Sequence, residues 1–208
     1  MVTAFDAMNA VGLVAFAMVG SLKAAEREFD VLGVAVLGVL TALGGGATRD
    51  VLVGRVPAVL QSTADVGFAL LGVVVAVLLA RQVGGGLLDH PAVMLPDAVG
   101  LAAFATTGAL VGHSAGVSPF GVVVLATVTG VGGGLISDVL LQRVPFVLAE
   151  DFYATCAVAG STAFWVVVTA GYGTAVAAAV CGGLTLSLRV LAIRYEWRLP
   201  TVRLRAAS

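Results

Sequence analysis

Charged residues are scarce in this chain. Lysine, arginine, aspartate and glutamate together make up only 11% of the 208 residues, whereas 60% of the residues are hydrophobic. A soluble globular protein has about 25% charged residues, many of which cover its surface. This composition therefore excludes the soluble classes, and the mean hydropathy of +1.08 indicates an integral membrane protein.

Cysteine and histidine are almost absent. Cys156 and Cys181 lie in apolar runs, where a cysteine acts as a small core residue more often than as a disulfide partner. His90 and His113 have no partner at ligand spacing, so we expect no metal site. The sequence shows neither a phosphate-binding loop nor a catalytic constellation. We therefore expect no enzymatic activity, no catalytic residues and no cofactor.

The chain contains long apolar runs. A helix needs about 20 residues to cross ~30 Å of hydrocarbon. We expect seven transmembrane helices in an all-α fold, at 5–22, 31–54, 64–80, 97–112, 118–142, 152–170 and 173–191. No basic region precedes the first run and no clear cleavage site follows it, so we expect it to be retained as a span.

Two parts of the chain nearly repeat each other. A glycine triplet, an aspartate and an Arg-Val-Pro sequence occur twice at the same spacing. The first copy consists of Gly44–Gly46, Asp50 and Arg55–Pro57, and the second consists of Gly132–Gly134, Asp138 and Arg143–Pro145. The match runs without a gap from Asn9 aligned with Asp97 to Leu60 aligned with Leu148. The sequence therefore predicts an internal duplication.

The number of spans in each copy sets their relative direction. Three spans are an odd number, so the second copy crosses the membrane in the opposite direction to the first, as inverted repeats do. The expected organisation is a first repeat at 1–83, a linker at 84–96, a second repeat at 97–170, a seventh transmembrane helix at 171–191 and a basic tail at 192–208.

Basic residues predict the orientation. Lys23, Arg27, Arg81 and Arg143 follow the first, third and fifth spans, and further arginines lie in the tail. On the other side, Arg55 alone stands clearly in a loop. The positive-inside rule then places the N-terminus outside and the C-terminus in the cytoplasm. Beside a membrane helix, the basic tail is expected to contact anionic lipid rather than nucleic acid.

Each glycine triplet lies inside a predicted span. Glycine costs about 1 kcal/mol relative to alanine in a helix, so three in succession predict a kink in the second and the fifth helix. Backbone groups freed by a kink must face protein or a water-filled cavity. Gly44–Gly46 and Gly132–Gly134 are therefore candidate pore-lining residues, with hydroxyls from Thr41 and Thr129. The alternative is that these glycines only permit close helix packing.

The aspartates follow one turn after the triplets. Asp50 stands beside Arg49, and Asp138 stands beside Ser137. In kinked helices these four residues would form vestibules in which carboxylates attract cations and Arg49 partly neutralises Asp50. In a straight helix, Asp50 would be an ordinary carboxylate near the membrane interface.

This doubled motif, with a seventh helix and a basic tail, resembles the trimeric intracellular cation (TRIC) channel family, and its prokaryotic branch in particular. The resemblance covers about 5–191. It implies a homotrimer in the cell membrane of a prokaryote, with a potassium-permeable pore inside each protomer. The chain departs from the animal members because its fourth span, 98–112, lacks a lysine. We therefore do not expect lysine-based gating from that span.

A carrier is the alternative function. A related bacterial family with twin glycine domains is labelled as glycine transporters. Broken helices would offer positive N-terminal ends to a carboxylate and carbonyl ends to an ammonium group, which suits a small zwitterion such as glycine. A non-conducting scaffold ranks last, because it would leave Asp50 and Asp138 unexplained.

Overall fold

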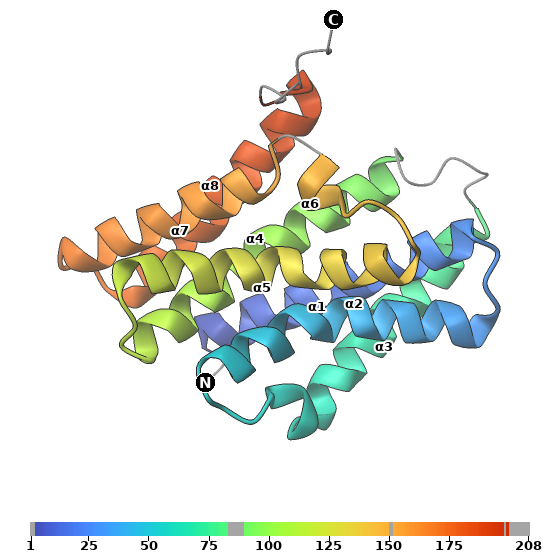
Figure 1. Cartoon of the computed structure of the whole chain (residues 1–208), viewed down its shortest axis with the longest axis horizontal. Helices are drawn as coiled ribbons and strands as arrows, with labels where there is room; N and C mark the ends of the chain where they lie inside the picture. The colour runs from blue at the N-terminus through green and yellow to red at the C-terminus, as the bar shows by residue number, and fades with distance from the viewer. Residues whose placement is uncertain (1–2, 83–89, 150–151, 198, 200–208) are drawn as a thin grey trace, which may run out of the picture.

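The computed structural model describes residues 3–82, 90–149, 152–197 and 199. Every regular element in these residues is helical (Figure 1). The elements are α1 (Ala4–Glu26), α2 (Val31–Leu52), η1 (Ala58–Leu60), α3 (Thr63–Ala80), α4 (Pro91–Ser114), α5 (Pro119–Leu140), α6 (Phe146–Ala149), α7 (Ala154–Thr169) and α8 (Thr174–Tyr195). The prediction of an all-helical membrane protein is confirmed.

Six of the helices in the described residues are long and apolar enough to cross a membrane: α1, α2, α3, α4, α5 and α8. Helix α7 is apolar but has only 16 residues. The predicted count of seven spans is therefore not confirmed. Helix α4 begins at Pro91, inside the range assigned to the linker, whereas the glycines of that linker lie outside the described residues.

Local sequence explains where several helices begin. Thr3 and Asp6 form a reciprocal capping box at the start of α1. The side chains of Asp30, Ser62 and Ser118 accept hydrogen bonds from the backbone N–H three residues later, at the starts of α2, α3 and α5. These caps satisfy N–H groups that have no partner within the helix.

Helices α1 and α4 pack against each other at the centre of the bundle (Figure 1). Phe16 and Phe104, which occupy matching positions in the two repeats, form an edge-to-face pair with ring centroids 5.2 Å apart. Each ring fills the space beside a glycine of the other helix, Phe104 against Gly12 and Phe16 against Gly100. Because matching residues meet each other, this pair marks the pseudo-twofold axis between the repeats.

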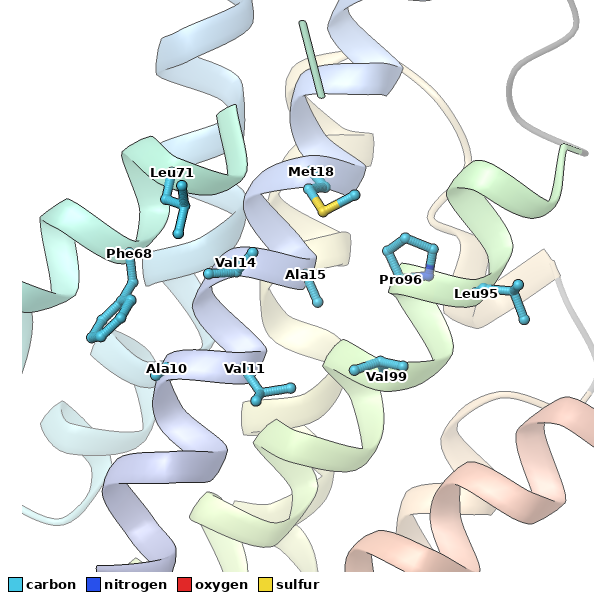
Figure 2. A pocket seen from close by; sticks show the side chains of 10 residues that line it. All are labelled: Ala10, Val11, Val14, Ala15, Met18, Phe68, Leu71, Leu95, Pro96 and Val99. Carbon is cyan, nitrogen blue, oxygen red and sulfur yellow. The ribbon is translucent and has the colours of Figure 1, made fainter. Parts of the chain in front are cut away.

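Helix α8 breaks the symmetry of the bundle. Its Thr185 hydroxyl donates a hydrogen bond to the carbonyl oxygen of Cys156 in α7, and the helix also packs over Thr106 of α4. The matching residues of the first repeat, Phe68 and Met18, instead line an open groove of about 550 Å³ among α1, α3 and α4 (Figure 2). All the side chains lining this groove are apolar, so it offers no ligand for an ion.

The central aromatic pair generates a prediction about stability. We expect Phe16→Ala and Phe104→Ala to lower the free energy of unfolding by similar amounts, about 3–5 kcal/mol, because each leaves a cavity at the same interface. Thermal unfolding in detergent measures the effect. Phe120→Ala is the control, because Phe120 is 78% exposed and should change little. A clearly smaller loss of unfolding free energy for one of the two variants would contradict the equivalence of Phe16 and Phe104 at the pseudo-twofold axis.

Candidate functional site

The glycine triplets lie where α2 and α5 cross. A Cβ atom at Gly45 would overlap the carbonyl oxygen of Thr129, and a Cβ atom at Gly133 would overlap the carbonyl oxygen of Thr41. A Cβ atom at Gly132 would lie 3.1 Å from the Cα atom of Gly45. The two backbones therefore touch, and only glycine permits this approach.

Both helices continue through their triplets as uninterrupted α-helices. The kinks expected at Gly44–Gly46 and Gly132–Gly134 are not confirmed, because neither helix is broken at its triplet. The third glycine of each triplet has a different environment from the middle one. Gly134 has no described atom of another element within 4 Å of its Cβ position, and Gly46 borders a small cavity.

The contacts at the crossing show the direction of the two helices. Thr41 meets Gly133, whereas Gly45, one turn further along α2, meets Thr129, one turn earlier along α5. The helices therefore run antiparallel, and the aspartate that follows each triplet lies at the opposite end of the crossing from the other. This is the arrangement that inverted repeats predict.

The predicted threonines are buried in helix contacts. Thr41 and Thr129 are both 0% exposed, and each hydroxyl donates a 2.6 Å hydrogen bond to the carbonyl four residues earlier in its own helix. Thr41 packs against Gly20 of α1, and Thr129 packs against the matching Gly108 of α4. Both hydroxyls are satisfied within the protein, and a role for them on an ion path stays a prediction.

Each aspartate of the repeated motif caps the element that follows it. Asp50 Oδ2 accepts a hydrogen bond from the backbone N–H of Ala58 at 2.9 Å, and Asp138 Oδ2 accepts one from Phe146 at 2.8 Å. In both copies the donor lies eight residues later, directly after the proline of Arg-Val-Pro. This hydrogen bond gives the repeated spacing a local structural cause. Because the bond occupies Oδ2, Oδ1 of each aspartate stays available for a cation.

Arg49 neutralises Asp50 within the first repeat. Its Nε and Nη2 atoms both lie 2.8 Å from Asp50 Oδ1. Nη1 donates a 3.3 Å hydrogen bond to Thr107 of α4, and the guanidinium lies 5.4 Å from the ring centroid of Phe5. Arg49 is 2% exposed, so several contacts from three helices hold this buried cation.

Lys23 neutralises Asp138 in the second repeat. Its Nζ atom lies 2.6 Å from Asp138 Oδ1. The placement of Lys23 in a loop after the first span was wrong, because it lies inside α1 and is 7% exposed. Ser137, which matches Arg49 in position, instead donates a hydrogen bond to the carbonyl of Gly134. The sequence did not reveal this pair, since 115 residues separate its members.

Asp50 borders two polar cavities. The wider cavity has a volume of about 270 Å³ and is lined by Arg49, Asp50 and Gln61 among others. The narrower one has about 20 Å³, which is room for roughly one water molecule, and extends from Asp50 to Asn9 and Asp65. The Asn9 amide donates a 3.1 Å hydrogen bond to Asp65. The two cavities thus share Arg49 and Asp50 in their linings.

A third polar cluster was not predicted. Asp97 accepts a 3.1 Å hydrogen bond from the Tyr153 hydroxyl, and the pair matches Asn9 and Asp65 of the first repeat. The guanidinium of Arg189 in α8 lies 4.8 Å from the ring centroid of Tyr153. The sequence contained a signal for this cluster, because Asp97 and Tyr153 align with the polar pair of the first copy.

Within the described residues, no three histidine, cysteine, aspartate or glutamate side chains stand close enough to hold a metal ion. Cys156 and Cys181 are free and buried. His113 lies in α4 against the rings of Phe164 and Trp165. The chemistry of the site is therefore that of carboxylates with buried cationic partners.

The fold and the site together define a class. This is a multi-pass helical membrane protein. Its glycine triplets join two antiparallel helices, and a buried, neutralised carboxylate lies at each end of their crossing.

Comparison with known proteins places the chain in a family. A family model described as glycine transporter matches residues 6–81 and again 94–169, which are the two repeats. The UPF0126 membrane protein of Deinococcus radiodurans is 38% identical over 95% of this chain and 91% of its own length. YvgT of Bacillus subtilis and YadS of Escherichia coli, an inner membrane protein, are each 37% identical over 95% of this chain and cover 96% and 95% of their own lengths. The chain belongs to this UPF0126 family of twin-repeat membrane proteins.

Solved structures of TRIC channels share the fold. One of them is described as the structural basis for conductance through TRIC cation channels. It has a TM-score of 0.87 and 37% sequence identity to this chain, and the match covers 99% of this chain and 100% of the other. A trimeric intracellular cation channel orthologue from Rhodobacter sphaeroides has a TM-score of 0.86 and 28% identity, covering 94% and 100%. The predicted resemblance to the TRIC family is confirmed.

The backbone contact between α2 and α5 generates a second prediction. We expect Gly45→Ala and Gly133→Ala to lower the free energy of unfolding by about 1–3 kcal/mol, because each new Cβ atom forces a backbone carbonyl of the other helix away. Gly134→Ala is the matched control: its Cβ has open space, and alanine favours helix by up to about 1 kcal/mol. Thermal unfolding in detergent should therefore separate Gly134→Ala from the other two variants, and equal losses would contradict the packing role.

Proposed function

We propose that this protein is a channel for monovalent cations, permeable to potassium, with the ion path inside each protomer. The observation that carries the proposal is the pair of buried carboxylates, Asp50 and Asp138, at opposite ends of the α2–α5 crossing. The likeness to structures described as TRIC cation channels supports it.

Buried carboxylates at both ends of a path favour cations over anions. Each carboxylate cancels the positive charge of its buried partner, Arg49 or Lys23, so neither end of the path carries a net positive charge that would repel a cation. The cavity of about 270 Å³ beside Asp50 is the proposed entrance for a hydrated ion, and the cavity of about 20 Å³ that shares Arg49 and Asp50 in its lining is the proposed next step, which has to widen during conduction. From there the proposed path follows Gly44–Gly46 and Gly132–Gly134 along the α2–α5 crossing, with Arg49, Ser137 and the two aspartates at the ends of the crossing.

A carrier for a small zwitterion is less well supported by the geometry. That mechanism needs broken helices whose free ends hold a carboxylate and an ammonium group. Helices α2 and α5 continue through their triplets, so these ends are not formed there. The observation that favours the carrier is the match to a family model described as glycine transporter.

The assembly and the location complete the proposal. We propose a homotrimer, as the structure from Rhodobacter sphaeroides is described, in the inner or cell membrane of a prokaryote, where YadS is described. The N-terminus faces outward, and the basic tail faces the cytoplasm and its anionic lipids. The transported ion is potassium, and the proposal includes no enzymatic activity, no cofactor and no nucleic-acid partner.

Ion flux tests the function. We expect purified protein in liposomes to carry potassium down its gradient, and planar-bilayer recording to show unitary currents. Asp50→Asn and Asp138→Asn should each lower the cation flux about tenfold, because either change leaves a buried cation unpaired on the path. Arg27→Met serves as the control, since Arg27 is exposed and the aspartates pair with Lys23 and Arg49 instead.

Glycine uptake distinguishes the two functions. If liposomes accumulate glycine but show neither potassium flux nor unitary currents, the channel proposal is wrong. Flux that is the same in both aspartate variants as in the unchanged protein would mean that the ion path lies elsewhere.

The assembly is tested separately. We expect multi-angle light scattering in mild detergent to give a protein mass of about three chains of 20.8 kDa. A mass of one chain across detergents and in lipid nanodiscs would contradict the trimer without bearing on the ion path inside a protomer.

A further inference from the structure

The two ends of the α2–α5 crossing neutralise the same carboxylate with different cations. Asp50 and Asp138 hold matching positions and make the same backbone hydrogen bond eight residues ahead. The cation at Asp50 comes from the adjacent residue, Arg49, whereas the cation at Asp138 comes from Lys23 on α1. The residue that matches Lys23 in the second repeat is Val111. The two cations therefore do not occupy matching positions in the two repeats.

The two cations also differ in how firmly they are held. Arg49 is bound through three nitrogens, by Asp50 and Thr107, and its guanidinium lies against a phenyl ring. Lys23 has Asp138 Oδ1 as its one hydrogen-bond acceptor within the described residues. An ammonium group on a four-carbon chain has rotational freedom that a planar, forked guanidinium held in this way lacks. Lys23 is therefore the cation that can leave its carboxylate.

A lysine ammonium and a potassium ion present the same charge to a carboxylate oxygen. Asp138 is 4% exposed, so its charge is costly without a cation nearby. Its Oδ2 atom is held by the backbone of Phe146, which leaves Oδ1 for one cation. A permeating ion and Lys23 thus compete for the same oxygen.

We propose that Lys23 is a tethered cation that occupies an ion site at Asp138 and must be displaced before a potassium ion binds there. This inference rests on the proposed cation path. The lysine sets how much potassium is needed to load this end of the path, while the fixed Arg49 leaves the other end permanently neutralised.

Two substitutions test the competition in opposite directions. Lys23→Met keeps the length of the side chain and removes its charge, so Asp138 becomes free for potassium. We expect the potassium concentration for half-maximal flux in liposomes to fall about tenfold. Lys23→Arg replaces the ammonium with a fork that binds a carboxylate more firmly, so the same concentration should rise several-fold.

A binding measurement that needs no conduction completes the test. Replacing choline chloride by potassium chloride at constant ionic strength should raise the melting temperature of Lys23→Met in detergent by about 3 °C, because an ion that binds only the folded state stabilises it. Lys23→Met combined with Asp138→Asn removes both charges and should lose this response. Arg27→Met, four residues further along and exposed, should respond like the unchanged protein.

The outcomes separate the inference from the function on which it rests. If the unchanged protein carries no potassium but Lys23→Met is stabilised by it, the channel function fails and the ion site at Asp138 stands. If potassium flux is present and neither Lys23 variant changes its half-maximal concentration, the tethered-cation role is wrong. If Lys23→Met does not fold, an unchanged half-maximal concentration in Lys23→Arg alone overturns the inference.

Discussion

The backbone contact between α2 and α5 is the constraint on which the rest of the structure depends. Gly45 and Gly133 let the two helices approach until a glycine on each faces a carbonyl oxygen of the other. Antiparallel helices in such contact have little freedom to slide, because a shift brings a larger side chain into the gap. The aspartate one turn beyond each triplet is thereby held at a defined distance from the crossing, and its backbone cap orients the carboxylate.

Neutralisation of these carboxylates links the crossing to the other helices. At one end, Arg49 reaches Thr107 of α4 and the ring of Phe5 at the start of α1. At the other end, Lys23 comes from the last turns of α1. Since α1 contributes to both ends, a movement of this helix along its axis changes the electrostatics of both at once. The helix at the centre of the bundle is thus also the mechanical connection between the two ends.

Much of this architecture could be predicted from the sequence, because the repeated motif reveals the internal duplication. The paired triplets and aspartates predicted inverted repeats, and the alternative reading of the glycines as packing residues describes the contact at Gly45 and Gly133. Kinks were expected because helix propensity alone disfavours glycine, but tertiary contact outweighed propensity. Lys23 was misplaced because an apolar run does not show where a helix ends, and its partner lies in another repeat.

The Phe16–Phe104 pair has a consequence for how the two halves of the chain can diverge. Each ring contacts its own counterpart, so the two positions form a single interface that belongs equally to both halves. Away from the axis, one copy can change while the other stays as it was, as Lys23 and Val111 illustrate. At the axis, a change in one copy alters the surroundings of the same position in the other. The two repeats are therefore most constrained to stay alike at the positions where matching residues contact each other.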